Sequence, residues 1–174
     1  VLESYGTDAL VTKTSALTSN WDISIETVLK ALCRHKDLSP NIRGNNLSEN
    51  DLILKWINKY RNGQSGRIST RISNPPGTVA DPVIDKIINS RITNLNNIQL
   101  AQIKFAHRLS MSAENILGLL LEEYIEGDLK TLGWHMCWGE TIRSVDFCHT
   151  SGRLLQIKNR SNSENSSSSR VRIG

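Results

Sequence analysis

The chain has 174 residues, and its 21 Lys and Arg residues exceed its 17 Asp and Glu residues by a net charge of +4. This length suits a single domain with a sizeable core, and no apolar run is long enough to span a bilayer, so we expect no membrane segment. The three cysteines lack CxxC spacing and no secretory signal is evident, which predicts a cytoplasmic protein with reduced thiols.

The chain before residue 110 has mainly helical patterns. Asp22 is a candidate N-cap for a helix that reaches about Lys36. Ser48 and Asp51 form a capping-box pattern before a helix over residues 52–61. Two further helices are predicted over residues 81–88, after an Asn-Pro-Pro-Gly breaker, and over residues 98–109.

A separate amphipathic helix is predicted over residues 112–125, with Ser112 as its N-cap. Its apolar stripe has the spacing i, i+3, i+4 and i+7 and comprises Leu117, Leu120, Leu121 and Tyr124. A strand is expected to follow, with Trp134, Met136 and Trp138 alternating on one face and packing under the N-terminal helices.

Residues 144–158 predict a β-hairpin, because apolar residues alternate on both sides of a Thr-Ser-Gly turn. Pairing outward from this turn places Cys148 opposite Leu154. The same register places Asp146 opposite Gln156, and Lys158 follows on the same face.

An acid, an amide and an ammonium would therefore converge on one patch. Phosphodiester hydrolysis needs a hard cation held by oxygen ligands and positive charge beside the transition state. Asp146 and Gln156 could bind Mg²⁺, and Lys158 could orient the attacking water or neutralise developing charge. An ordinary amphipathic hairpin with a polar outer face would give the same pattern.

The pattern Val145-Asp146 followed by Gln156-Ile157-Lys158 resembles the PD-(D/E)xK nuclease signature, with Gln in a place that usually holds an acid. The resemblance implies that Asp146, Gln156 and Lys158 are catalytic. In this family a helix before the first core strand carries a further metal-binding Glu, for which we select Glu122. Glu114 and Glu123 are its rivals.

The segment from Gln156 through the following Ser/Asn-rich stretch resembles type II restriction endonucleases of the SinI kind. This resemblance covers roughly residues 114–172 and implies magnesium-dependent cleavage of double-stranded DNA at a short recognition sequence, with a cognate DNA methyltransferase in the same system. Cutting both strands of a palindrome suits a two-fold symmetric homodimer of the full-length protein. The resemblance also implies that the Ser/Asn-rich stretch after Lys158 is a loop near DNA. The candidate DNA-binding residues are therefore Asn159, Arg160, Asn162, Ser163, Asn165, Arg170 and Arg172.

The expected fold is α/β (α+β). A helical subdomain over residues 1–110 would lead into a partial PD-(D/E)xK core with a mixed sheet over residues 111–174, and we expect the chain to be a fragment. Residues 111–150 carry a net charge of −5, between segments of +5 and +4, as a metal-binding nuclease requires. The Gly/Ser-rich stretch with Arg61, Arg67 and Arg71 is either a DNA-contacting loop or a solvated connector.

Three alternatives stay open. A structural zinc site could use His135, Cys137, Cys148 and His149. The protein could instead be another nuclease of the same fold, acting in repair or on DNA junctions. It could also be a non-catalytic DNA-binding module in which the polar hairpin is incidental, so that its activity would not depend on Asp146 or Lys158.

Overall fold

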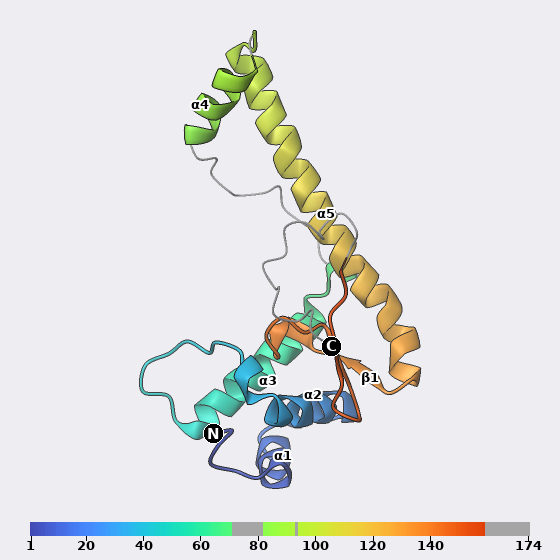
Figure 1. The fold of residues 1–174 in the computed structure, drawn as a ribbon. Helices are drawn as coiled ribbons and strands as arrows, with labels where there is room; N and C mark the ends of the chain where they lie inside the picture. The colour runs from blue at the N-terminus through green and yellow to red at the C-terminus, as the bar shows by residue number, and fades with distance from the viewer. Residues whose placement is uncertain (71–81, 93, 159–174) are drawn as a thin grey trace.

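The computed structural model describes residues 1–70, 82–92 and 94–158, which form a mostly helical α+β structure with one small antiparallel sheet (Figure 1). The α-helices are α1 (Thr7–Ser15), α2 (Ile23–Arg34), α3 (Glu49–Ser65), α4 (Pro82–Arg91) and α5 (Asn97–Thr131). The short 3-10 helices are η1 (Lys36–Leu38), η2 (Ile68–Thr70) and η3 (Trp138–Glu140). The strands are β1 (Trp134–Met136), β2 (Phe147–His149) and β3 (Leu154–Leu155).

The predicted starts of α2 and α3 are confirmed by their caps. The Asp22 carboxylate accepts hydrogen bonds from the backbone N–H groups of Ser24 and Ile25, at 2.9 and 3.0 Å. At the start of α3, Ser48 and Asp51 form the expected capping box, in which each side chain accepts from the other residue's backbone N–H. These bonds satisfy donors that have no partner within the helix and so fix where each helix begins.

The core lies where α1, α2 and α3 meet the sheet. It buries side chains from all four parts, including Leu10, Val28, Trp56, Tyr60, Ile142 and Phe147. The indole N–H of Trp56 donates to the backbone oxygen of Thr141 at 3.2 Å, which ties α3 to the loop between η3 and β2. Helices of the N-terminal half and strands of the C-terminal half thus share one core.

The prediction of two helices over 98–109 and 112–125 is wrong, because α5 is continuous from Asn97 to Thr131. Its N-cap is Asn96, whose side-chain oxygen accepts a hydrogen bond from the backbone N–H of Gln99. The Gln99 side-chain oxygen in turn accepts a hydrogen bond from the backbone N–H of Asn96. Ser112 lies inside the helix, and no Pro or Gly lies within five residues of it. The predicted domain boundary between residues 110 and 111 therefore falls within α5, and the division into two domains stays a prediction.

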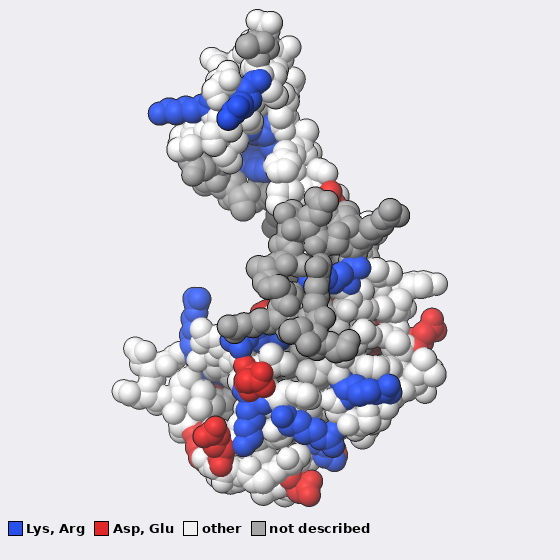
Figure 2. All heavy atoms as spheres, viewed as in Figure 1, with Lys and Arg blue, Asp and Glu red and all other residues white. Residues whose placement is uncertain are grey.

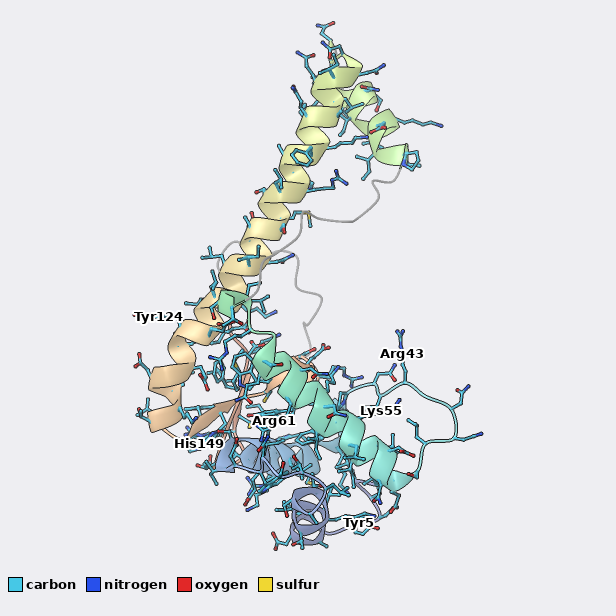
Figure 3. The ribbon with its side chains drawn as sticks, turned by 180° about the vertical axis from the view of Figure 1, so that it is seen from behind. Tyr5, Arg43, Lys55, Arg61, Tyr124 and His149 are labelled. Carbon is cyan, nitrogen blue, oxygen red and sulfur yellow. The ribbon has the colours of Figure 1, made fainter. Side chains whose placement is uncertain are left out.

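The N-terminal half of α5 projects away from the body together with α4, and we call this pair of segments the arm (Figure 1). Lys104 on α5 pairs with Asp85 on α4 at 2.6 Å. The apolar stripe predicted on α5 is present but is not buried, since its members are 38–79% exposed: Leu117, Leu120, Leu121 and Tyr124. Tyr124, the most exposed of them, points away from the body in Figure 3.

The sheet has the order β1-β2-β3, and all pairings among the described residues are antiparallel, so the predicted mixed sheet is not seen in this part of the chain. Strand β1 ends at Met136, earlier than predicted. Trp138 belongs to η3 because the backbone turns at Gly139 and Glu140, which have φ values of +67° and +57°. Trp138 is buried beside α3. No helix among the described residues is long and apolar enough to cross a membrane.

Candidate functional site

The hairpin has the register that the sequence predicts. Cys148 pairs with Leu154 and Phe147 with Leu155, and Gly152 in the turn has a φ of +92°. The backbone N–H of Asp146 donates to the oxygen of Leu155 at 3.1 Å, so the register continues beyond the strands. Asp146 just before β2 and Gln156 just after β3 are thereby brought to one end of the hairpin.

The Asp146 carboxylate is hydrogen-bonded to the backbone that follows β3 of the same hairpin. One carboxylate oxygen, Oδ2, accepts a hydrogen bond from the backbone N–H of Ile157 at 2.6 Å. Burial raises the pKa of Asp146, and this hydrogen bond and the positive charge of Lys158 partly oppose the rise. The carboxylate is therefore oriented but only partly compensated in charge.

Glu122 approaches the same site from α5. Burial raises its pKa to about 7, and the nearby negative charges of Asp146 and Glu123 contribute to the rise. Helix α5 contacts β1, and β1 pairs with β2, so the sheet positions the helix beside the hairpin. The structure thus brings Glu122 and Asp146 together, although they lie on different elements.

The two carboxylates line a cavity of about 850 Å³, which we call the carboxylate cavity. Gln156 is part of its lining, as the predicted site requires. Its walls come from the end of α3, η2, α5, β1, η3 and the start of the hairpin, and they also include Gly63, Arg67, Glu123, Met136, Trp138, Gly139 and Glu140.

The rivals of Glu122 occupy different surroundings. Glu123 also lines the cavity, but its carboxylate accepts hydrogen bonds from the backbone N–H of Ile68 and the hydroxyl of Ser69. Glu114 lies eight residues before Glu122 on α5, about 12 Å along the helix axis, and is not among the cavity-lining residues of the described chain. Of the three, Glu122 is the one whose carboxylate lies beside Asp146 and accepts no hydrogen bond from the described residues.

Lys158 is the last described residue, and its charge acts on Asp146. The predicted DNA-binding residues lie outside the described residues; they are Asn159, Arg160, Asn162, Ser163, Asn165, Arg170 and Arg172. The site accordingly consists, in the described chain, of two carboxylates, one amide and one ammonium.

The donor set of the cavity suits a hard cation. Two carboxylates with raised pKa values repel each other in a partly buried space, and a divalent cation would relieve that repulsion. No group of three His, Cys, Asp or Glu side chains suited to a metal occurs in the described part of the chain. A complete coordination sphere would therefore also need the Gln156 amide, water or substrate oxygens.

The zinc alternative does not form among the described residues. Cys137 and Cys148 are buried and hydrogen-bonded to each other, which raises the pKa of the Cys137 thiol. His135 Nδ1 lies 3.0 Å from the Ser24 hydroxyl, whereas His149 Nε2 lies 3.1 Å from the backbone oxygen of Leu132. The two histidines are thus engaged with different parts of the structure.

Sequence reasoning missed two features of the cavity wall. The first is the stacking of Arg67 on Trp138, with the guanidinium Cζ 5.1 Å from the ring centroid, which places in the cavity wall a residue that the sequence assigned only to a DNA-contacting loop or a solvated connector. The second is a backbone contact between α3 and η3, where a Cβ on Gly63 would lie only 2.2 Å from the backbone nitrogen of Gly139. The one local signal was Gly63 itself, an unfavourable residue inside a helix that therefore indicates close packing.

Comparison with known proteins shows the family of the chain. The family model described as "SinI restriction endonuclease" matches residues 35–174. The type II restriction enzyme Eco47I of Escherichia coli is 47% identical over 103 residues, and the type II restriction enzyme SinI of Salmonella infantis is 44% identical over 103 residues. Each alignment covers 56% of this chain and 44% of the relative, so the chain spans a little under half the length of these relatives. The chain belongs to the SinI restriction endonuclease family.

Proposed function

We propose that this chain carries the catalytic site of a type II restriction endonuclease that hydrolyses phosphodiester bonds of double-stranded DNA at a specific sequence with Mg²⁺. The observation that carries the proposal is the meeting of Glu122, from a helix, with Asp146 and Gln156, from the hairpin, in one cavity. Family membership and the type II restriction enzymes among its relatives support the same reaction.

Glu122, Asp146 and Gln156 would hold the magnesium ion. When bound there, Mg²⁺ would supply a Lewis acid and lower the pKa of a bound water. The fit rests on the chemistry of the donor set. Burial disfavours the charged form of both carboxylates, and a bound cation would stabilise that form. Gln156 contributes a neutral oxygen in place of an acid, so the site keeps one negative charge fewer than an all-carboxylate site.

The protein groups around the cation have separate tasks. The backbone N–H of Ile157 fixes the orientation of the Asp146 carboxylate. Lys158 places a positive charge near Asp146, where it stabilises negative charge on the substrate phosphate or orients the attacking water. A partly closed cavity strengthens both electrostatic effects, because it reduces screening by bulk water.

Other parts of the proposal concern the whole protein. We propose that it folds around a PD-(D/E)xK core, acts in the cytoplasm as a homodimer on two-fold symmetric sites, and works beside a cognate DNA methyltransferase. The segment after Lys158 would contact DNA through Asn159, Arg160, Asn162, Ser163, Asn165, Arg170 and Arg172. Figure 2 supports a DNA-binding role in general terms, since on the face it shows basic side chains lie over both the arm and the body.

The test is cleavage of plasmid DNA by the purified protein with Mg²⁺. Discrete bands are expected from the unmodified protein and should be lost in Asp146→Asn and Glu122→Gln. The matched control is Glu114→Gln, which removes a carboxylate from the same helix outside the cavity and should cleave normally. Calorimetric titration with Mg²⁺ gives a second readout, since binding should weaken in the first two variants and persist in the control.

Each other outcome has a definite meaning. Loss of cleavage in Glu114→Gln with retention in Glu122→Gln would reverse the assignment of the helix carboxylate. Cleavage confined to branched or mismatched DNA would indicate a repair or junction nuclease. A folded protein that binds DNA but shows no Asp146-dependent cleavage of any DNA would indicate a binding module.

A further inference from the structure

Arg67 has an unusual position for a charged residue in the carboxylate cavity. It is the one Lys or Arg side chain among the described residues that line this cavity, where four acidic residues, Glu122, Glu123, Glu140 and Asp146, also lie. It forms no ion pair with any of them in the described part of the chain. A cation that faces carboxylates without pairing with them retains its capacity to bind another anion.

The Arg67 side chain is held in place by neutral groups. Its Nε donates to the backbone oxygen of Gln64 at 3.2 Å, and the guanidinium plane lies over the Trp138 ring. Among the described residues, its two terminal amino groups have no hydrogen-bond partner. An arginine fixed through Nε and stacked on an indole presents its two remaining nitrogens together, the arrangement that binds two phosphate oxygens.

The backbone that carries Arg67 is anchored beside the proposed metal ligands. Glu123 accepts hydrogen bonds from the N–H groups of Ile68 and Ser69 and from the Ser69 hydroxyl. Glu122, the preceding residue on α5, faces the carboxylate cavity. Consecutive residues of one helix thus position the helix carboxylate and the segment that carries the arginine.

Arg67 also lines a second hollow, of about 860 Å³. Most of its other lining residues are polar, among them Asn20, Asp22, Arg61 and Gln64. Arg61 there already pairs with Asp22 at 3.3 Å, so its charge is partly compensated. Arg67 is the one residue that lines both hollows in the described part of the chain.

We propose that Arg67 binds a backbone phosphate of the DNA strand at the mouth of the carboxylate cavity and orients that strand for cleavage. The proposal rests on the proposed function and adds a residue to its site. The ligand class is a phosphodiester, because its two non-bridging oxygens match the paired guanidinium nitrogens and its charge offsets the arginine. Base recognition is not required of this contact.

The experiment measures DNA affinity against salt concentration for duplex DNA in EDTA, where no cleavage occurs, and then the single-turnover cleavage rate with Mg²⁺. Arg67→Gln should lower affinity roughly 10-fold and reduce the slope of log K against log salt by about 0.9, the loss of one phosphate contact. Arg67→Lys should keep most of the slope but cleave more slowly, since an ammonium cannot bind two oxygens in a fixed plane.

The matched control is Arg43→Ala. Arg43 is exposed and lies on the loop before α3, where its backbone oxygen accepts a hydrogen bond from Lys55 Nζ at 2.8 Å, and it lies on the other side of the body from the hairpin residue His149 (Figure 3). This variant should keep the slope and the cleavage rate of the unmodified protein. Both Arg67 variants keep most of the side-chain stem, and circular dichroism of each variant shows whether its fold is retained.

The outcomes separate this proposal from the proposed function. An unchanged slope and cleavage rate in folded Arg67→Gln would overturn the role of Arg67, even if Asp146→Asn abolishes cleavage. A reduced slope in Arg67→Gln without cleavage by any form would support the contact while the proposed catalysis fails. Absence of DNA binding by the unmodified protein would overturn both.

Discussion

Replacing Glu122 with Gln should remove a pH-dependent loss of stability from the metal-free protein. Gln has nearly the shape of protonated Glu but cannot become charged. The folded-state pKa of Glu122 is about 7, against an ordinary value of 4.5. Between these two values the folded chain binds more protons than the unfolded chain, so the stability that this group contributes is present at low pH and is lost as the pH rises toward 7.

The size of the effect follows from the shift. At about 1.36 kcal/mol per pKa unit, the full shift from 4.5 to about 7 corresponds to roughly 3.4 kcal/mol. Glu122 is half-buried, so solvent screening reduces this to roughly 1–2 kcal/mol. At about pH 8, Glu122→Gln should therefore be more stable than the unmodified chain by roughly 1–2 kcal/mol, while at about pH 4 the two should be nearly equal.

The assay is urea denaturation of both proteins in EDTA across this pH range. The difference between the free energies of unfolding of the two proteins gives the contribution of Glu122, because both proteins contain all the other titrating groups. Mg²⁺ should then reverse the order at high pH, since a ligand at 100 times its dissociation constant stabilises the folded state by about 2.7 kcal/mol. Parallel pH profiles for the two proteins would refute the argument that Glu122 is buried beside the Asp146 charge.

Three further perturbations test the structure. Gly139→Ala should destabilise the fold by roughly 3 kcal/mol in urea denaturation, because its backbone has a positive φ and its Cβ would lie 2.0 Å from the Lys59 oxygen; a loss below about 1 kcal/mol would contradict this packing. Asn96→Ala should weaken hydrogen-exchange protection at the start of α5 by about 1 kcal/mol, whereas Ser112→Ala should not, and the reverse result would restore a helix start at Ser112. Glu123→Gln should cost roughly 1–2 kcal/mol in thermal denaturation, since its hydrogen bonds to η2 lose their charge, and no change would show that η2 is not anchored there.

Local chemistry explains which parts of the fold could be predicted from sequence. The hairpin register followed from side-chain alternation and a three-residue turn ending in Gly152, and the structure confirms it. The caps at Asp22 and Ser48 were equally local and are also confirmed. Placement of Asp146 and Gln156 at one end of the hairpin followed directly from that register.

Features that depend on distant contacts were harder to predict. Ser112 has the chemistry of a cap, but nothing nearby breaks the helix, so α5 passes through it. The sequence left the stretch with Arg67 open between a DNA-contacting loop and a solvated connector, because its ring partner Trp138 lies 71 residues away in the chain. The turn that removes Trp138 from β1 depends on positive φ at Gly139 and Glu140, and the second of these is not a glycine. The catalytic roles of the site residues remain predictions.

Helix α5 has a mechanical consequence for the site. It runs without a break from the arm at Asn97 past Glu122, which lies 25 residues later, a distance of about 38 Å along the axis. An unbroken helix transmits a tilt along its whole length, so a tilt imposed at the tip of the arm turns the segment that carries Glu122 through the same angle. Because misplacement by about 1 Å can cost on the order of 100-fold in rate, the alignment of the cavity is sensitive to forces applied far from it.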